Sequence, residues 1–176
     1  GMEAACRARD RGHDVTLIDR GRRVGGQLLL AAVPPGRKDI TLFTDYLAGR
    51  LARSGVKVFL NEEISTTRIL SLRPDAVILA TGAQPCVLAV PGLAAERSLT
   101  AWDVLAGRSI PEGPCLVVGA GLVGCETADF LSEAGEKVTV VELLPEIAGD
   151  ADKDTRAYFD IRFREKGISV HTGVTL

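Results

Sequence analysis

Long apolar runs are missing from this sequence of 176 residues. The longest, Leu28–Val33, ends at a pair of prolines and is far too short to cross a bilayer. The first residues also lack the charged and apolar regions of a secretory signal peptide. We therefore expect a cytoplasmic protein and no membrane as a partner.

An excess of positive charge is missing too. The chain has 21 Lys and Arg residues against 23 Asp and Glu residues, and its net charge is −2 at pH 7. Proteins that bind nucleic acids need a basic surface to neutralise phosphates. We therefore expect no nucleic acid as a partner.

Metal and redox motifs are scarce. The sequence has four cysteines and two histidines, with no C-x-x-C pair and no Cys/His pair at metal-ligand spacing. This pattern argues against a zinc site, an iron–sulfur cluster and a redox dithiol, so we predict no metal site. We interpret the four cysteines as small buried apolar residues in a reducing compartment. They are Cys6, Cys86, Cys115 and Cys125.

What the chain does contain is an internal duplication. Residues 1–19 align without a gap on residues 124–142. Both segments begin with glycine, Gly1 and Gly124, and five further positions in the aligned segments carry identical residues. A second match places 50–58 on 162–170, in the same order of helix, glycine and strand. The chain therefore contains two copies of one unit, too few for a solenoid.

Both units alternate helices with short apolar strands. The patterns predict helices over 2–11, 38–53, 122–134 and 154–166, and strands over 15–18, 56–60, 75–80, 115–118, 137–141 and 168–171. Such alternation is typical of βαβ units. The fold class that we predict is α/β, with two incomplete Rossmann-like units and mostly parallel sheets.

A glycine motif lies in the second unit. Gly119, Gly121 and Gly124 form G-x-G-x-x-G between a predicted strand and a predicted helix, and Glu142 ends the next strand. In this context the glycines allow a tight turn, the approach of a pyrophosphate and helix–strand packing, while free N–H groups of the helix receive the phosphates. The alternative is a tight turn without a ligand.

The choice between the two nicotinamide nucleotides depends on the residues after this strand. Glu142 can accept hydrogen bonds from a ribose diol. No Arg or Lys between Val141 and Asp152 could neutralise a 2′-phosphate. The sequence therefore favours NADH over NADPH.

The first unit carries the later part of the same motif. Gly1 aligns with Gly124, and Asp19 aligns with Glu142. The first strand of this unit would precede residue 1, and the counterpart of strand 75–80 would follow the C-terminus, so we expect a chain cut at both ends. The loop Arg23–Gln27 contains two adjacent glycines, which permit close passage past a flat ligand or form an ordinary glycine loop.

These segments together resemble a known family, the pyridine-nucleotide flavin oxidoreductases. The resemblance is carried by Asp19–Leu28, Ala80–Pro85, Val90–Leu93, Thr100–Leu105 and Val118–Glu126. The group with the greatest similarity is the multidomain NADH:flavin oxidoreductases of the 2,4-dienoyl-CoA reductase and trimethylamine dehydrogenase type. In that group a barrel with FMN and a 4Fe–4S cluster precedes two dinucleotide-binding domains, and this sequence contains neither the barrel nor a cluster motif.

The resemblance implies a division of the chain and a set of cofactor contacts. Residues 1–88 are similar to a partial FAD-binding domain without its first strand, and 89–176 to a partial NAD(P)H-binding domain without its last strands. The implied FAD contacts are Gly1, Asp19, Arg23, Gly25, Gly26, Gln27, Ala80, Thr81 and Gly82. The implied NADH contacts are Gly119, Gly121, Leu122, Val123, Gly124, Glu126 and Glu142. For Glu126 the alternative is a first-turn acid favoured by the helix dipole.

The implied function is that of a fragment of a larger enzyme. The parent protein passes hydride from NADH to FAD, and electrons then go to a separate substrate domain; FMN and 4Fe–4S belong to the missing part. We identify no catalytic side chain, because the cofactors carry this chemistry, and we expect the chain alone to be inactive. The alternative is a non-catalytic scaffold that binds ADP or FAD, or an assembly domain. A sheet that lacks a strand also predicts self-association.

Overall fold

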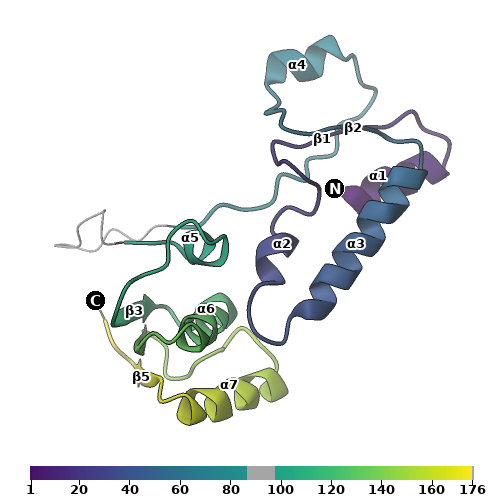
Figure 1. The fold of residues 1–176 in the computed structure, drawn as a ribbon. Coiled ribbons are helices and arrows are strands. Elements are labelled where there is room, and N and C mark those ends of the chain that lie inside the picture. The colour runs from purple at the N-terminus through teal and green to yellow at the C-terminus, as the bar shows by residue number, and fades with distance from the viewer. Residues whose placement is uncertain (87–97, 176) are drawn as a thin grey trace. The chain divides into compact units, whose positions relative to one another are not determined.

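The computed structural model describes residues 1–86 and 98–175. The chain divides into two compact units. Unit 1 consists of Gly1–Ala32 and Arg37–Gln84, and unit 2 of Val33–Gly36 and Pro85–Leu176 (Figure 1). The expected Val90–Leu93 motif and the linker around it lie outside the described residues.

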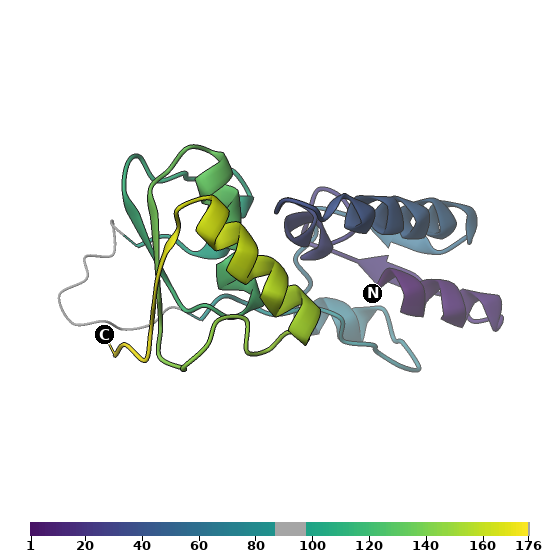
Figure 2. The same cartoon turned by 90° about the horizontal axis from the view of Figure 1, so that it is seen from below.

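Unit 1 is built on a pair of helices and a small sheet. Its elements are α1 (Met2–Asp10), β1 (Thr16–Ile18), α2 (Leu28–Ala31), α3 (Lys38–Arg53), β2 (Lys57–Phe59) and α4 (Thr66–Ser71). The two strands pair in parallel, with Leu17 opposite Val58. Helices α1 and α3 lie side by side (Figure 2), and the apolar residues that they share form the core of the unit.

Unit 2 is a three-stranded parallel sheet with its helices. The elements are α5 (Ala101–Leu105), β3 (Cys115–Val118), α6 (Leu122–Glu133), β4 (Val138–Glu142), α7 (Lys153–Glu165) and β5 (Ser169–Thr172). The strand order is β3-β4-β5. Each strand is reached from the one before it through a helix, which is the connection that parallel strands require.

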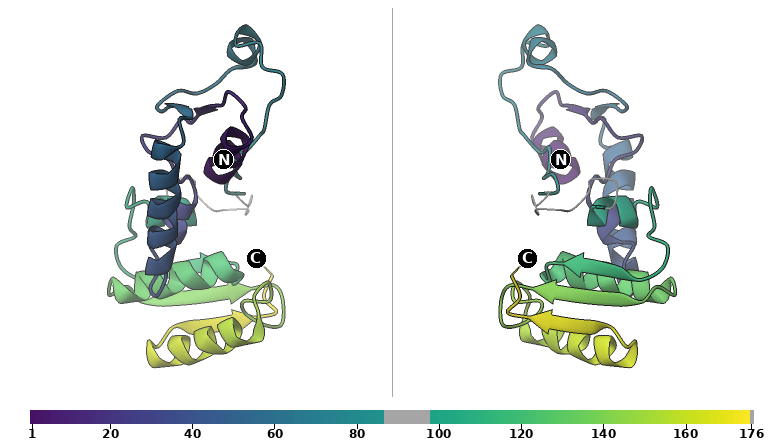
Figure 3. Two further views of the ribbon diagram at one scale, coloured as in Figure 1. Left: turned by 90° about the vertical axis from the view of Figure 1, so that its right-hand side faces the viewer. Right: turned by 90° about the vertical axis from the view of Figure 1, so that its left-hand side faces the viewer.

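One face of this sheet holds the core of unit 2. The register aligns Val117, Val140 and Val170 in one row across the three strands. These valines pack with Phe159 and Phe163 of α7 and with apolar residues of α6. Figure 3 shows both helices alongside the strands. The fold is therefore α/β with two small parallel sheets, as the sequence pattern predicts.

One predicted strand does not form. Residues 75–80 have no regular secondary structure, and the sheet of unit 1 consists of β1 and β2. Three apolar side chains of this segment are 51%, 67% and 80% exposed, in the order Val77, Ile78 and Leu79. A strand needs a neighbour to bond its N–H and C=O groups, and among the described strands none pairs with 75–80. The prediction was wrong because apolar pattern alone does not supply that neighbour.

The cysteines differ from the prediction at one position. Cys6 and Cys125 are buried and Cys115 is partly buried, but Cys86 is exposed. Cys86 follows Pro85 in a described stretch without regular secondary structure. Among the helices that the structure describes, none is both long and apolar enough to cross a membrane.

Candidate functional site

The glycine motif of unit 2 forms the turn from β3 into α6. Gly119 follows the last residue of β3 and has a φ of +92°, a conformation that residues with a side chain rarely adopt. A Cβ atom at Gly124 would overlap the carbonyl oxygen of Gly119. The first turn of α6 thus packs directly on the backbone of the loop, as the motif predicts.

Carboxylates already bond two N–H groups of this turn. The N–H of Leu122 donates to Oδ1 of Asp150 at 2.8 Å, and the N–H of Ala120 donates to Oε2 of Glu142 at 2.5 Å. The sequence predicted free N–H groups at the start of α6, and for Leu122 that prediction was wrong. The cause is the positive end of the helix, which attracts the nearest anionic side chains.

Glu142 is positioned by the end of β4. Besides the N–H of Ala120, its carboxylate accepts the N–H of Leu144 at 2.8 Å. The N–H of Leu144, followed by that of Ala120, holds the pKa of Glu142 below its ordinary value, while the Asp150 carboxylate acts in the opposite direction. Glu142 is therefore ionised at neutral pH and lies at the glycine turn, where the sequence predicted it.

A loop after β4 closes over the same turn. The N–H of Ala148 donates to the carbonyl of Ala120 at 2.6 Å, and Ala148 is fully buried with a φ of +47°. The thiol of Cys125 donates to the same carbonyl at 3.3 Å. Burial raises the pKa of Cys125 to about 12, so this thiol is a packing residue and not a nucleophile.

Asp150 is the site residue that sequence reasoning missed. It follows Gly149 in an exposed stretch of this loop, with no motif to mark it. A Cβ atom added to Gly121 would lie 3.4 Å from Oδ2 of Asp150. The remaining predicted residues of this turn lie in α6, where Val123 is 55% exposed and Leu122 and Glu126 are partly buried.

Unit 1 brings four of its predicted cofactor residues into two contacts. Gly1 is the N-cap residue of α1, and a Cβ atom there would lie 3.8 Å from that of Ala80. The side-chain amide of Gln27 lies against Gly82 and donates from Nε2 to the carbonyl of Ala83 at 3.1 Å. These contacts join the start of α1 and the glycine loop to the 80–83 segment.

The other predicted residues of unit 1 surround the end of β1. Asp19 follows β1, and its Oδ1 accepts the N–H of Gly21 at 2.7 Å. Gly25 and Gly26 have φ values of +119° and +52°, so both need the freedom of glycine. The last two predicted residues, Arg23 and Thr81, are exposed.

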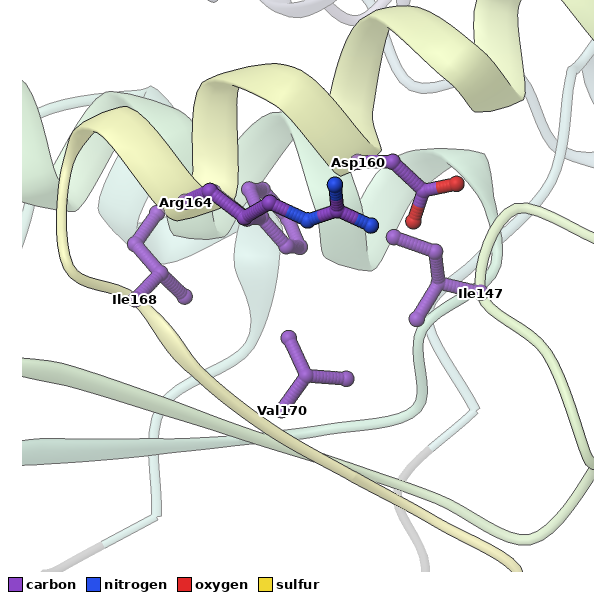
Figure 4. A pocket seen from close by; sticks show the side chains of 6 residues that line it. Ile147, Asp160, Arg164, Ile168 and Val170 are labelled. Atoms are coloured by element: carbon purple, nitrogen blue, oxygen red, sulfur yellow. The ribbon is translucent and has the colours of Figure 1, made fainter.

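Unit 2 also has a small pocket, and none of the predicted cofactor residues lines it. Its volume is about 190 Å³, and it lies between α7 and the end of the sheet (Figure 4). The lining consists of Ile147, Asp160, Phe163, Arg164, Ile168 and Val170. This volume is below the range of about 300–1,000 Å³ of small-molecule sites, so the pocket is too small for a dinucleotide.

Comparison with known proteins assigns the chain to a family. The family model described as pyridine nucleotide-disulphide oxidoreductase matches residues 1–176. The chain is 42% identical to an NADH oxidase of Thermoanaerobacter brockii, over 98% of this chain and 27% of that protein. It is 36% identical to a bilirubin reductase of Mediterraneibacter gnavus, with the same two coverages of 98% and 27%. The chain thus spans about a quarter of the length of these relatives.

A solved structure supports the same family. A complex of 2-naphthoyl-CoA reductase with 2-naphthoyl-CoA matches 99% of this chain and 26% of that chain, with a TM-score of 0.93 and 26% identity. The resemblance stated from the motifs is therefore confirmed, and so is the partial coverage. We conclude that this chain belongs to the pyridine nucleotide-disulphide oxidoreductase family and corresponds to a FAD/NAD-binding portion of its multidomain flavoprotein members.

Proposed function

We propose that this chain holds FAD and NADH in a flavin oxidoreductase, in which hydride passes from NADH to FAD and electrons pass on to a separate substrate domain. The observation that carries the proposal is the β3–α6 turn. Its backbone admits only glycine at Gly124, and the N–H of Leu122 already bonds an anionic oxygen, that of Asp150, in the position proposed for a phosphate oxygen. The proposed domains are 1–88 for FAD and 89–176 for NADH.

In the NADH site, each residue has a proposed role. Gly119, Gly121 and Gly124 admit the pyrophosphate and the helix, and the first residues of α6, Leu122 and Val123, offer their backbone to the phosphates. Glu142 binds the ribose diol. Glu126, in the first turns of α6, faces the nicotinamide end. Two carboxylates at the turn, with no Lys or Arg over 142–151, favour NADH over NADPH.

In the FAD site, the proposed contacts come from the start of α1, the end of β1 and two loops. The proximity of Gly1 to Ala80 and of Gln27 to Gly82 supports a shared site. Asp19 takes the ribose position that Glu142 takes in unit 2. The proposed FAD residues are Gly1, Asp19, Arg23, Gly25, Gly26, Gln27, Ala80, Thr81 and Gly82.

The chemistry of this proposal requires orientation and not a catalytic side chain. When bound, NADH supplies a hydride and FAD accepts it. The chain contributes backbone N–H groups, glycines that allow close approach, and carboxylates that hold the riboses. By itself the chain is proposed to bind nucleotides and to have no turnover, because it covers only about a quarter of the length of its relatives and the proposed substrate domain is not part of it.

Calorimetric titration of NADH into the 176-residue chain tests the proposal, with Gly121→Asp as the variant. This substitution places a second carboxylate beside Asp150, where a Cβ atom would lie 3.4 Å from Oδ2. We expect a loss of NADH binding through steric overlap and charge repulsion.

The matched control is Gly49→Asp, which adds the same charge in α3 of unit 1. We expect this control to bind NADH like the original chain. Equal NADH affinity of Gly121→Asp and the original chain would refute the assigned site.

A second candidate role is a non-catalytic scaffold for ADP or FAD, or an assembly domain. The exposed apolar side chains of Val77, Ile78 and Leu79 favour it, since such a segment can pair with another chain. Under this proposal the chain self-associates. Steady NADH oxidation by the purified chain with FAD and an electron acceptor would exclude a purely structural role, and it would also contradict the proposed lack of turnover in the chain alone.

A further inference from the structure

The Asp150 carboxylate occupies an N–H donor of the proposed pyrophosphate site. Its Oδ1 accepts the N–H of Leu122, the first residue of α6, at 2.8 Å. A Cβ atom at Gly121 would lie within 3.6 Å of all three atoms of this carboxyl group. Asp150 therefore covers both the N–H donor and the glycine that lets a phosphate approach.

Backbone contacts place Asp150 there. Ala148, two residues earlier, is bonded through its N–H to the carbonyl of Ala120 at 2.6 Å and is fully buried. Its left-handed conformation, with a φ of +47°, is unfavourable for alanine and persists only where the surroundings enforce it. The loop is thus fastened to the glycine turn immediately before Asp150, whereas the Asp150 side chain is exposed.

Glu142 differs from Asp150 in this respect. Glu142 lies at the end of β4, and two backbone N–H groups hold its carboxylate, those of Ala120 and Leu144. Asp150 is exposed, so a rotation of its side chain can release Leu122 without any movement of the backbone. Of the two acids, Asp150 is the one that can leave and return.

We propose that Asp150 competes with the nucleotide diphosphate for the N–H of Leu122, and that this competition sets the affinity of the site for NADH. The inference rests on the NADH site proposed above. A phosphate oxygen and the Asp150 oxygen are both anionic acceptors, so the N–H can serve only one of them well. The negative charge of Asp150 also repels the diphosphate until the side chain turns away.

The test compares NADH binding by calorimetry in the full chain and in two variants, Asp150→Asn and Asp150→Ala. We expect the dissociation constant of Asp150→Ala to fall about tenfold, because a charge-assisted hydrogen bond no longer has to be broken. Asp150→Asn keeps an acceptor oxygen without the charge, so its NADH affinity should lie between that of the original chain and that of Asp150→Ala. Asp154→Asn, in the first turn of α7, removes the same charge elsewhere and should leave NADH affinity unchanged.

Amide hydrogen exchange of Leu122 gives a readout independent of affinity. Without nucleotide, this amide should exchange faster in Asp150→Ala than in the original chain, and NADH should protect it in both. Equal or weaker NADH binding by the Asp150 variants would overturn the competition while the NADH site stands. Absence of NADH binding in all of the chains, the original included, would overturn the proposed function and this inference together.

Discussion

At the scale of residues, Gly124 is the described glycine of unit 2 at which an added Cβ atom would come nearest to another atom, the carbonyl oxygen of Gly119. Because a Cβ atom at Gly124 would overlap backbone, Gly124→Ala has to move α6 away from the turn. We expect the free energy of unfolding to fall by about 2 kcal/mol, as for overpacked sites. Urea denaturation followed by circular dichroism measures it.

The matched control for that substitution is Gly149→Ala. A Cβ atom at Gly149 would have no neighbour within 4 Å, and its φ is not positive. Its effect should stay within about 0.5 kcal/mol of zero. A loss of stability in Gly124→Ala no larger than that in the control would contradict the tight packing of the glycine turn.

Glu142 links stability to pH. Its folded pKa is lowered by the N–H groups of Leu144 and Ala120, so it stabilises the fold fully above its ordinary pKa of 4.5. This contribution is lost as the pH falls below 4.5 and through the lowered pKa of the folded state. Glu142→Gln should therefore cost about 1 kcal/mol at pH 7, where a charged acceptor is lost, and progressively less below pH 4.5.

Urea unfolding of both chains between about pH 3 and pH 7 measures this difference, over the range where Glu side chains titrate. A gap between the two unfolding free energies that stays constant over this range would mean that Glu142 does not hold its hydrogen bonds as a carboxylate.

At the scale of elements, the two units repeat one interhelical ion pair. In unit 1, Arg50 of α3 bonds Asp10 of α1 at 2.7 Å. In unit 2, Arg162 of α7 bonds Glu133 of α6, also at 2.7 Å. These four residues occupy matching positions in the internal duplication, so the alignment of the two copies corresponds to one packing arrangement of the helices.

Unit 2 adds a buried acid to this arrangement. Asp129 of α6 is 1% exposed and accepts from Nε of Arg162 at 2.9 Å and from Nζ of Lys166 at 2.6 Å. Asp129→Ala would leave both cations without their buried partner. We expect a loss of about 3 kcal/mol of unfolding free energy, measured by urea denaturation.

Glu133 provides the comparison, since it bonds the same two cations from a side chain that is 50% exposed. Glu133→Ala should cost less than about 1 kcal/mol, because solvent screens an exposed pair. Similar losses in Glu133→Ala and Asp129→Ala would show that burial does not determine the strength of this network.

At the scale of the whole molecule, the segment 75–80 predicts association between chains. Ile78 is 67% exposed within an apolar run that forms no strand in unit 1. Light scattering should therefore show an apparent mass above that of one chain, rising with concentration. Ile78→Lys should lower this mass towards 18.7 kDa, because a charge within the apolar run opposes its pairing as a strand with another chain.

Ile161→Lys is the control for that measurement. Ile161 is 56% exposed, but it lies in α7, whose N–H and C=O groups bond within the helix. The same change there should leave the apparent mass unaltered. A monomer at every concentration would refute association. An equal effect of both substitutions would indicate nonspecific hydrophobic association instead of strand pairing.

Local patterns in the sequence were enough to predict most of the fold and to identify the family. The helix over 38–53 and the strand over 115–118 form as predicted, because apolar periodicity and glycine stops act over a few residues. The glycine turn was also predictable, since close backbone approach admits one residue type. The acid at the end of β4 was predictable from its spacing after the glycine motif. These signals depend on neighbours along the chain.

Contacts between distant segments decided the rest. Residues 75–80 have a strand pattern and no strand, because pairing depends on a neighbour that the pattern does not provide. Asp150 reaches Leu122, 28 positions away in sequence, only because the loop after β4 is fastened at Ala148. Periodicity and motifs carry no information on such a contact, and the folded loop therefore determines which anion the helix terminus holds.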